Sequence, residues 1–402
     1  MIIYRADSTT GMGAKRRSID TDLVHAGESP DPLTGAVAPI LVRTKTYSQK
    51  FGEKSKWQYS RGQNPTRSAL EEKLAAIEGG GSATAFGSGL AAEAMLFMTL
   101  RPGDHIVIPD EVYGGTLRLL KHVIANFGIS FSSSDFKTEK SIASSVKQNT
   151  KYLFVEALTN PSLNSIDLSL VRDVSNKLCV PYAADMTFTP PCAARAYDYG
   201  AEAIVHSISK YIAGHNDVIG GSVATRNVKL DESLKFLQRS VGAILSPDEC
   251  YRAIQGVKTL KVRWDAVSRS AQKIAEELCG NQKISRTLYP GLDSHPTHEI
   301  AKKQIKNGFG AVISFEIAKD YRHRLRDFVE ELQSGGIITY GESLASPETL
   351  LAHPATMSHG SLTAEERERM GITDTFFRLS VGLESKDDIL DSIGEGLKKL
   401  VR

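Results

Sequence analysis

Residues 201–210 read AEAIVHSISK, an apolar run of strand-forming residues that ends in two serines and a lysine. Two similar runs precede it, KYLFVEA (151–157) and VPYAAD (180–185), and a helical pattern over 168–178 lies between them. Strands that alternate with helices in this way predict a mostly parallel sheet covered on both faces. The sequence therefore predicts an α/β fold around residues 201–210.

The same alternation continues toward the N-terminus. HIVIPD (105–110) predicts a buried strand, and FGSGLAAEAMLFMTL (86–100) places a Gly-Ser-Gly turn directly before a helix. Thr66 is expected to cap an earlier helix, because its hydroxyl can accept a hydrogen bond from a free N–H group. The first sixty or so residues are rich in Thr, Ser, Gly and Lys without a sustained period. They predict an extended arm that packs on a neighbouring chain, and hence an oligomer.

The pattern changes after about residue 259. A helix over 264–278 and later strands predict a smaller α+β domain. Its last helix (385–400) opens with Ser385 and Asp388 in capping-box spacing. We therefore expect three parts, which are an N-terminal arm over 1–60, a large domain over 61–259 and a C-terminal domain over 260–402.

Composition and charge exclude several classes of protein. The 402 residues are 41% hydrophobic and 24% charged, which is typical of a globular protein rather than a disordered or fibrous one. A formal net charge of +2 argues against a nucleic-acid-binding protein, since those carry a strong basic excess. No apolar run approaches the ~18 residues of a membrane helix. In the first 17 residues the basic side chains follow the apolar ones, which is the wrong order for a secretory signal.

The four cysteines lie far apart and never form a CxxC pair. This spacing favours free thiols of a reducing compartment over a disulfide pair or a zinc site. We therefore expect a cytoplasmic protein that has no membrane partner and no metal site.

Polar side chains stand where the strands of the large domain end, and ligands of open parallel sheets collect at those ends. The helix that starts at Gly89 and Leu90 also presents free N–H groups, which attract a phosphate. Taken singly, each feature has an ordinary explanation, such as a tight turn, a buried hydrogen-bond acceptor or a solvated lysine. The side chains at the strand ends are Glu156, Asp185, Ser207, Ser209 and Lys210.

Together these residues meet the requirements of pyridoxal phosphate. A desolvated lysine can hold the aldehyde as an imine, and a carboxylate can keep the pyridine nitrogen protonated. Tyr113, just beyond the strand at 105–110, can cover one face of the ring. One alternative is the S-x-x-K motif of penicillin-binding enzymes, which Ser207 and Lys210 also satisfy. That alternative is disfavoured because the serine falls in a strand-like run and no KTG or SDN segment accompanies it.

The sequence resembles the Cys/Met-metabolism family of pyridoxal-phosphate enzymes, the cystathionine γ-synthase-like group, from about residue 20 to the C-terminus. The most specific segment is HSISKYIAGHNDVIGG (206–221). Five further segments match in the family's order, namely YSRGQNPT (59–66), SGLAA (88–92), DEVYGGT (110–116), TNPS (159–162) and FFRLSVGLE (376–384). The resemblance implies a fold-type I enzyme that binds pyridoxal 5'-phosphate in its large domain.

The resemblance also implies roles for the cofactor-binding residues. Lys210 would form the Schiff base and then move protons, and Asp185 would pair with the pyridine nitrogen. Tyr113 would stack on the ring and act as an acid or base. The phosphate would be bound within one subunit by Gly89, Leu90, Ser207 and Ser209, and from the neighbouring subunit by Tyr59 and Arg61.

On the substrate side, the resemblance implies that Asn160, Ser343 and Arg378 hold the amino-acid carboxylate. Glu342, just before Ser-Leu, resembles the glutamate that in cystathionine lyases and γ-synthases suits the distal ammonium of cystathionine; the alternative is a surface carboxylate. The family's members are usually homotetramers built from two active dimers.

These features together favour γ-elimination from a homocysteine- or homoserine-derived amino acid in transsulfuration, and cystathionine γ-lyase in particular. The alternatives are cystathionine γ-synthase, cystathionine β-lyase, a specialised carbon–sulfur lyase, and a catalytically silent relative that serves as a binding subunit. Methionine γ-lyase is disfavoured, because its family pattern has a cysteine where this chain has Gly115.

Two departures from the family pattern concern the pocket. Met186 stands in place of the usual asparagine, which would remove a polar group beside the cofactor. Ala345 and Ser346 replace a Gly-Gly pair. Both departures point to an altered substrate.

Overall fold

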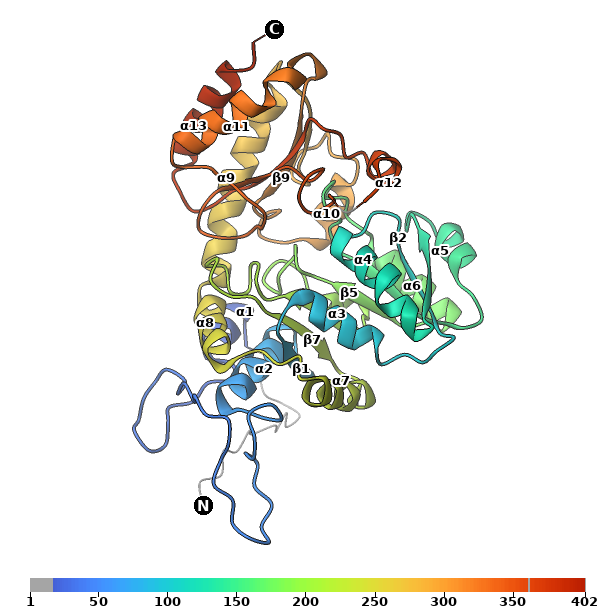
Figure 1. Ribbon diagram of the computed structural model, residues 1–402, viewed down its shortest axis with the longest axis vertical. Coiled ribbons are helices and arrows are strands. Elements are labelled where there is room, and N and C mark those ends of the chain that lie inside the picture. Colours follow the sequence, from blue (N-terminus) through green and yellow to red (C-terminus); the bar gives the residue numbers. More distant parts are fainter. Residues whose placement is uncertain (1–16, 361, 402) are drawn as a thin grey trace.

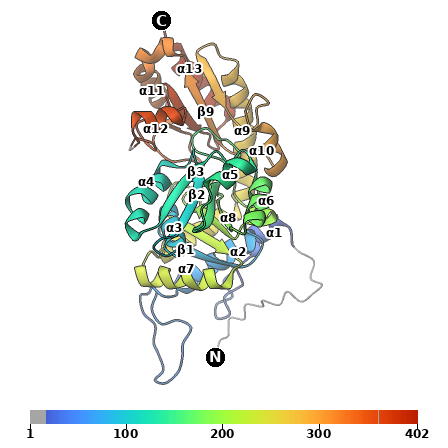
Figure 2. The ribbon, with the colours of Figure 1, turned by 90° about the vertical axis from the view of Figure 1, so that its right-hand side faces the viewer.

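The computed structural model of the protein describes residues 17–360 and 362–401. Two β-sheets, each covered by its own helices, lie one beyond the other along the long axis of the molecule (Figures 1 and 2). The long helix α9 (Leu260–Cys279) runs from the larger part into the smaller one (Figure 1).

The larger sheet has seven strands in the order β1-β7-β6-β5-β4-β2-β3. Strand β7 is antiparallel to both of its neighbours, and the remaining neighbours run parallel. The expected mostly parallel sheet is therefore confirmed, although the first strand was not predicted from the sequence. The bounds are β1 Ser82–Phe86, β2 His105–Pro109, β3 Ser130–Ser134, β4 Thr150–Glu156, β5 Tyr182–Asp185, β6 Ala203–Ser207 and β7 Gly221–Thr225.

Helices cover both faces of this sheet (Figure 1). In β4, Leu153 and Val155 join the apolar cluster on one face, while Tyr152 and Phe154 join the cluster on the other. Phe154 meets Phe97 edge to face, with the ring centroids 5.1 Å apart. Burial on both sides explains why these strands are continuously apolar. The helices are α2 Pro65–Ile77, α3 Gly89–Phe97, α4 Gly114–His122, α5 Glu139–Ser145, α6 Leu168–Leu178, α7 Val228–Val241 and α8 Pro247–Lys258, with short turns η1 Ile124–Phe127 and η2 Ala196–Tyr199.

Two capping predictions were wrong. Asn64, not Thr66, caps α2, because the Asn64 Oδ1 accepts hydrogen bonds from the N–H groups of Thr66 and Arg67 at 2.9 and 3.3 Å. The Thr66 hydroxyl instead donates to the carbonyl of Ile40 and so ties the arm to the helix. At the last helix, the Ser385 side chain makes no capping hydrogen bond.

The smaller sheet has five strands in the order β10-β11-β12-β9-β8. Strand β10 is only two residues long, and in the described sheet it pairs with the three-residue β11 alone. The strands are β8 Ile284–Leu288, β9 Val312–Ile317, β10 Thr339–Tyr340, β11 Leu350–Ala352 and β12 Phe376–Ser380. The other helices of this part are α10 His298–Gln304, η3 Lys319–Arg324, α11 Leu325–Ser334, α12 Ala364–Arg369 and α13 Lys386–Lys398.

The described part of the N-terminal arm has one helix, α1 (Ile19–His25). The buried Lys73 fixes it, because its amine donates to the carbonyls of Leu23 and Val24 and pairs with Glu28 at 2.8 Å. The two loops that follow α1 project away from the body of the molecule (Figure 1). The predictions for the first 16 residues lie outside the described range. Among the described residues, no helix has the length and apolar character needed to cross a membrane.

Candidate active site

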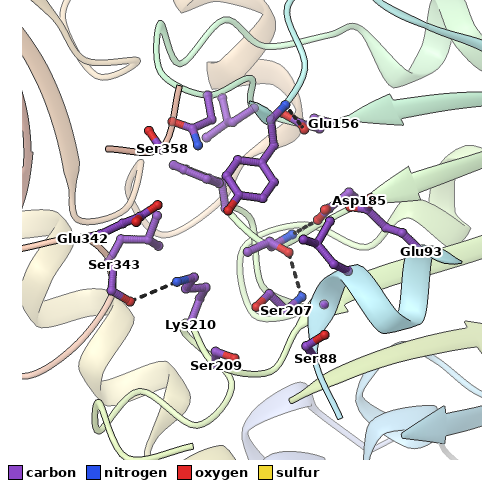
Figure 3. A pocket seen from close by; sticks show the side chains of 18 of the residues that line it. Ser88, Glu93, Glu156, Asp185, Ser207, Ser209, Lys210, Glu342, Ser343 and Ser358 are labelled. Carbon is purple, nitrogen blue, oxygen red and sulfur yellow. Dashed lines mark hydrogen bonds between the residues drawn. The ribbon is translucent and has the colours of Figure 1, made fainter. Parts of the chain in front are cut away.

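A pocket lies where the C-terminal ends of β4, β5 and β6 face the smaller sheet (Figure 3). A pocket at the C-terminal ends of parallel strands is a typical small-molecule site. The large sheet and its helices contribute Gly89, Leu90, Tyr113, Asn160, Asp185, Ser207, Ser209 and Lys210, and the smaller part contributes Glu342, Ser343 and Arg378. Eleven of the thirteen residues predicted for the site therefore line one pocket.

Lys210 lies in the turn after β6, where its N–H donates to the carbonyl of Ser207. Its amine donates a 2.9 Å hydrogen bond to the Ser343 hydroxyl (Figure 3). Burial, together with the positive charge of Arg378, lowers the pKa of Lys210 to about 8. An appreciable fraction of this amine is therefore neutral near physiological pH and able to attack an aldehyde.

Asp185 ends β5 on the opposite side of the pocket (Figure 3). Its Oδ1 accepts a 2.7 Å hydrogen bond from the N–H of Thr187. The Thr187 hydroxyl in turn accepts from the N–H of Ser207 at 2.8 Å, which joins the ends of β5 and β6. A carboxylate held in this way is a suitable partner for a protonated ring nitrogen.

The start of α3 packs against the end of β6. Gly89 is needed there, because a Cβ at this position would lie 2.9 Å from the Ser207 Cβ. The Ser88 hydroxyl caps the helix by accepting from the N–H of Ala91. The N–H groups of Gly89 and Leu90 belong to the first turn, whose donors have no partner within a helix. Together with the Ser207 and Ser209 hydroxyls, they form a cradle suited to a phosphate.

Tyr113 is fixed by its backbone, since its N–H donates to the Glu156 carboxylate at 2.6 Å. Burial and the nearby charge of Glu342 raise the pKa of the phenol, so Tyr113 remains protonated. A Cβ on Gly115 would lie 2.4 Å from the Tyr113 ring. The observed position of this ring therefore requires glycine at residue 115.

Arg378 in β12 lies on the side of the pocket formed by the smaller sheet and is only 3% exposed. Its Nη1 donates to the Asn160 side chain at 2.9 Å, and its Nη2 donates to the Ser343 carbonyl at 3.1 Å. Its Nε is buried and has no hydrogen-bond partner among the described residues. A planar cation held from two sides is well suited to bind a carboxylate.

Tyr59 and Arg61 lie outside this pocket. Tyr59 is 48% exposed and lines a separate cavity beside α2 and α7. The Arg61 guanidinium lies 5.6 Å from the Tyr59 ring and donates to the carbonyl of Arg239. One chain therefore does not bring these two residues to its own cradle, and their expected role in a neighbouring subunit stays a prediction.

The two departures from the family pattern have different consequences. The Met186 side chain is fully buried in an apolar cluster and does not line the pocket, so it affects the pocket through no direct contact. The segment after β10 is strained, because Ser343 and Ala345 have φ values of 136° and 62°. Ala345 is held by a hydrogen bond from its N–H to the Ser380 hydroxyl.

Several lining residues were not predicted. Glu93 is the most notable, because it is a 3% exposed carboxylic acid that extends from α3 toward Asp185 (Figure 3). The available signal was a single charged residue inside the apolar stretch GLAAEAMLF. The others come from loops without a chemical pattern and are Leu158, Thr187, Phe188, Leu344 and Ser358.

The pocket fits pyridoxal phosphate on three independent observations. The buried amine of Lys210 has a pKa of about 8, and the carboxyl group of Asp185 ends the neighbouring strand β5. The start of α3 lies against the hydroxyls of Ser207 and Ser209. A mostly parallel sheet with such a site and a smaller C-terminal sheet defines a fold-type I pyridoxal-phosphate enzyme.

Comparisons with known proteins identify the family. The profile described as "Cys/Met metabolism PLP-dependent enzyme" matches residues 20–398, and the chain belongs to this family. A relative from Coxiella burnetii, named cystathionine beta-lyase, is 42% identical over 94% of this chain and 98% of its own. A cystathionine gamma-lyase from Bacillus subtilis is 38% identical over 94% and 99%.

Solved structures agree with this assignment. Cystathionine gamma-lyase from Lactobacillus plantarum, complexed with L-serine, superposes with a TM-score of 0.91 at 37% identity and covers 96% of this chain and 99% of its own. Cystathionine gamma synthase from Xanthomonas oryzae pv. oryzae, in complex with cystathionine, gives 0.91 at 35% identity over the same shares. The chain is a PLP-dependent enzyme of sulfur amino-acid metabolism, and its relatives are lyases and a synthase.

Proposed function

We propose that the protein cleaves the Cγ–S bond of cystathionine, which is the reaction of a cystathionine γ-lyase. The observation that carries the proposal is that Glu342 and Arg378 line the same pocket. A substrate with a carboxylate near the reacting carbon and an ammonium group at its far end is complementary to this pair of charges.

In this proposal, each part of the pocket has one task. Lys210 binds the cofactor covalently, and Asp185 pairs with its ring nitrogen. Gly89, Leu90, Ser207 and Ser209 bind its phosphate, while Tyr113 covers its ring. Bound pyridoxal phosphate supplies an electron sink that acidifies the protons of the attached amino acid.

The chain supplies two proton-transfer groups beside that sink. Lys210, with a pKa of about 8, can take a proton from a substrate carbon and return it to another. Tyr113, whose pKa is raised, is a protonated acid that can donate to the departing sulfur. Elimination at Cγ needs proton removal at two carbons as well as an acid for the leaving group, so it uses both residues. Asn160, Ser343 and Arg378 hold the substrate carboxylate throughout.

A second candidate is cleavage of the Cβ–S bond, because a 42% identical relative is named cystathionine beta-lyase. In cystathionine, the carboxylate of either end is the same number of bonds away from the ammonium group of the other end. Glu342 and Arg378 can therefore hold the molecule in both orientations, which differ only in the position of the sulfur. Replacement at Cγ, as in a γ-synthase, uses the same residues and differs in the nucleophile that enters.

The products distinguish these possibilities. Purified protein loaded with pyridoxal phosphate should be incubated with cystathionine, and the 2-oxo acid identified by mass spectrometry. We expect 2-oxobutyrate with cysteine, whereas pyruvate with homocysteine would replace the proposal by the second candidate. Bound cofactor without turnover of cystathionine, or of an activated homoserine with cysteine, would indicate a catalytically silent binding subunit.

We further propose a homotetramer in which Tyr59 and Arg61 of one chain reach the phosphate cradle of another. Two features support the oligomer. Neither residue reaches the pocket of its own chain, and the projecting loops of the arm expose Leu33, Val37 and Phe51 at 83%, 79% and 107%. The four free cysteines support a cytoplasmic location.

A further inference from the structure

Two carboxyl groups meet beside the proposed position of the cofactor ring. Asp185 comes from the end of β5 and Glu93 from the middle of α3, and both line the pocket (Figure 3). Their charges interact directly. Two ionised carboxylates buried side by side would repel each other strongly, so such pairs share a proton.

The hydrogen bonds around the pair indicate which group carries the proton. Asp185 accepts a 2.7 Å hydrogen bond from a backbone N–H, which favours its ionised form. Within the part of the chain that the structure describes, Glu93 accepts only from the Thr116 hydroxyl, at 3.0 Å on Oε1. Its Oε2 is buried and has no hydrogen-bond partner among the described residues. An unpartnered buried oxygen beside a carboxylate is accounted for if it bears a hydrogen that points toward that carboxylate.

We propose that Glu93 is a neutral acid whose Oε2–H donates a hydrogen bond to the Asp185 carboxylate and so positions the partner of the cofactor's ring nitrogen. This inference rests on the proposed role of Asp185. Glu93 does not contact the reacting atoms, so it is a positioning residue. The pair then carries one negative charge, and the Asp185 side chain is held from two sides, by Thr187 and by Glu93.

The surrounding charges agree with this assignment. Burial and the neighbouring Asp185 raise the pKa of Glu93 well above its ordinary value. Glu156 on β4 and Tyr113 before α4 face the pair, and each adds to the unfavourable negative charge when ionised. Burial raises the pKa of Asp185 as well, but the hydrogen bonds from Thr187 and the nearby His206 side chain oppose that rise. The proton is therefore favoured on Glu93 rather than on Asp185.

A donated hydrogen bond should make Asp185 less basic and fix its orientation. Replacing Glu93 by glutamine preserves a neutral donor of the same shape, whereas leucine of similar volume removes the donor. A hydrogen bond to a charged group contributes about 1.5–3 kcal/mol. We therefore expect Glu93→Leu to weaken cofactor binding about ten- to a hundredfold, and Glu93→Gln to remain within about threefold of the original protein.

The test uses the full chain and three measurements. Cofactor affinity is measured by fluorescence titration with pyridoxal phosphate. The pH at which the visible band of the loaded protein changes is recorded for each variant. Infrared spectra of the cofactor-free proteins are recorded, and the spectrum of Glu93→Gln is subtracted from that of the original protein. The difference should contain the carbonyl band of a protonated carboxylic acid. That band should shift in Asp185→Asn, because the acceptor of its hydrogen bond changes.

Each outcome decides between explanations. The neutral donor is supported if Glu93→Gln keeps the original affinity for pyridoxal phosphate and the original pH midpoint of the visible band, while Glu93→Leu does not. If residue 93 only filled space, both variants would behave alike. An equal loss in both variants, or a difference spectrum with only carboxylate bands, would overturn the proposal. Failure of the original protein to bind pyridoxal phosphate would instead refute the role of Asp185 itself. Circular dichroism melting identifies variants that fail to fold.

Discussion

Nη1 of Arg378 donates a hydrogen bond to Oδ1 of Asn160 over 2.9 Å, although the two residues are 218 positions apart. Asn160 follows β4 of the large sheet, and Arg378 lies in β12 of the small sheet. The orientation of the guanidinium is therefore set by both parts of the chain at once, and any rearrangement between them would move the proposed carboxylate site.

Arg378→Lys should raise KM for cystathionine by about ten- to a hundredfold. A lysine amine cannot reproduce the two-point contact with a carboxylate, and a charge-assisted pair of this kind is worth about 1.5–3 kcal/mol. Asn160→Ala should give a smaller increase, because the guanidinium keeps its bond to the Ser343 carbonyl. Steady-state kinetics provide the measurement.

The matched control is Arg286→Lys, which changes a part-exposed arginine of the same sheet that bonds to the Gly371 carbonyl. This variant should keep the original KM. An unchanged KM in Arg378→Lys would place the substrate carboxylate elsewhere in the pocket.

The lowered pKa of Lys210 makes the stability of the cofactor-free protein depend on pH. The amine titrates near pH 8 in the folded chain and near its ordinary 10.5 in the unfolded one. Between these values the unfolded chain binds more protons, so the free energy of unfolding rises with pH. Below about pH 8 the destabilisation is complete, and it amounts to at most about 3 kcal/mol.

Lys210→Met removes this dependence and should be more stable than the cofactor-free original at pH 7. The difference in the free energy of unfolding should shrink steadily as the pH rises from about 8 toward 10. Urea unfolding of both proteins at several pH values measures it. A difference that stays constant with pH would mean that the amine is not desolvated.

The sequence predicted the parts of the site that depend on local patterns. Asp185 and Lys210 were found because apolar strands end there, and Gly89 because a Gly-Ser-Gly turn precedes a helix. Glu93 was missed, since a lone acid in an apolar helix has no chemical pattern and its neighbour Asp185 is distant in sequence. The surroundings of Met186 could not be predicted from the sequence either. Successive side chains of a strand point to opposite faces, so the direction of a side chain next to the strand end depends on where β5 ends exactly.

Glu342→Ala should raise KM for cystathionine more than KM for a substrate without a distal ammonium group. The Glu342 side chain is exposed, so the lost ion pair is worth at most about 1 kcal/mol, which corresponds to a change in KM of up to roughly fivefold. Glu348→Ala in the same segment is the control, since Glu348 does not line the pocket. Equal effects on both substrates would mean that Glu342 is a surface carboxylate that does not bind the distal ammonium group.

The proposed contribution of Arg61 to a neighbouring subunit predicts complementation between two inactive variants. Lys210→Ala should lose the visible cofactor band and turnover, while Lys229→Ala on the exposed surface of α7 should keep both.

Arg61→Ala should retain the lysine but bind the phosphate weakly. If each site takes Lys210 from one chain and Arg61 from its partner, a mixed dimer contains one site with both changes and one with neither. Random pairing of equal amounts then gives about a quarter of the original activity. The test is the activity of the protein obtained after co-expression of the two variants. The control is the activity of the separately purified variants, mixed under conditions in which they do not exchange subunits. Recovery no greater than the sum of the two variants would mean that Arg61 acts within its own chain.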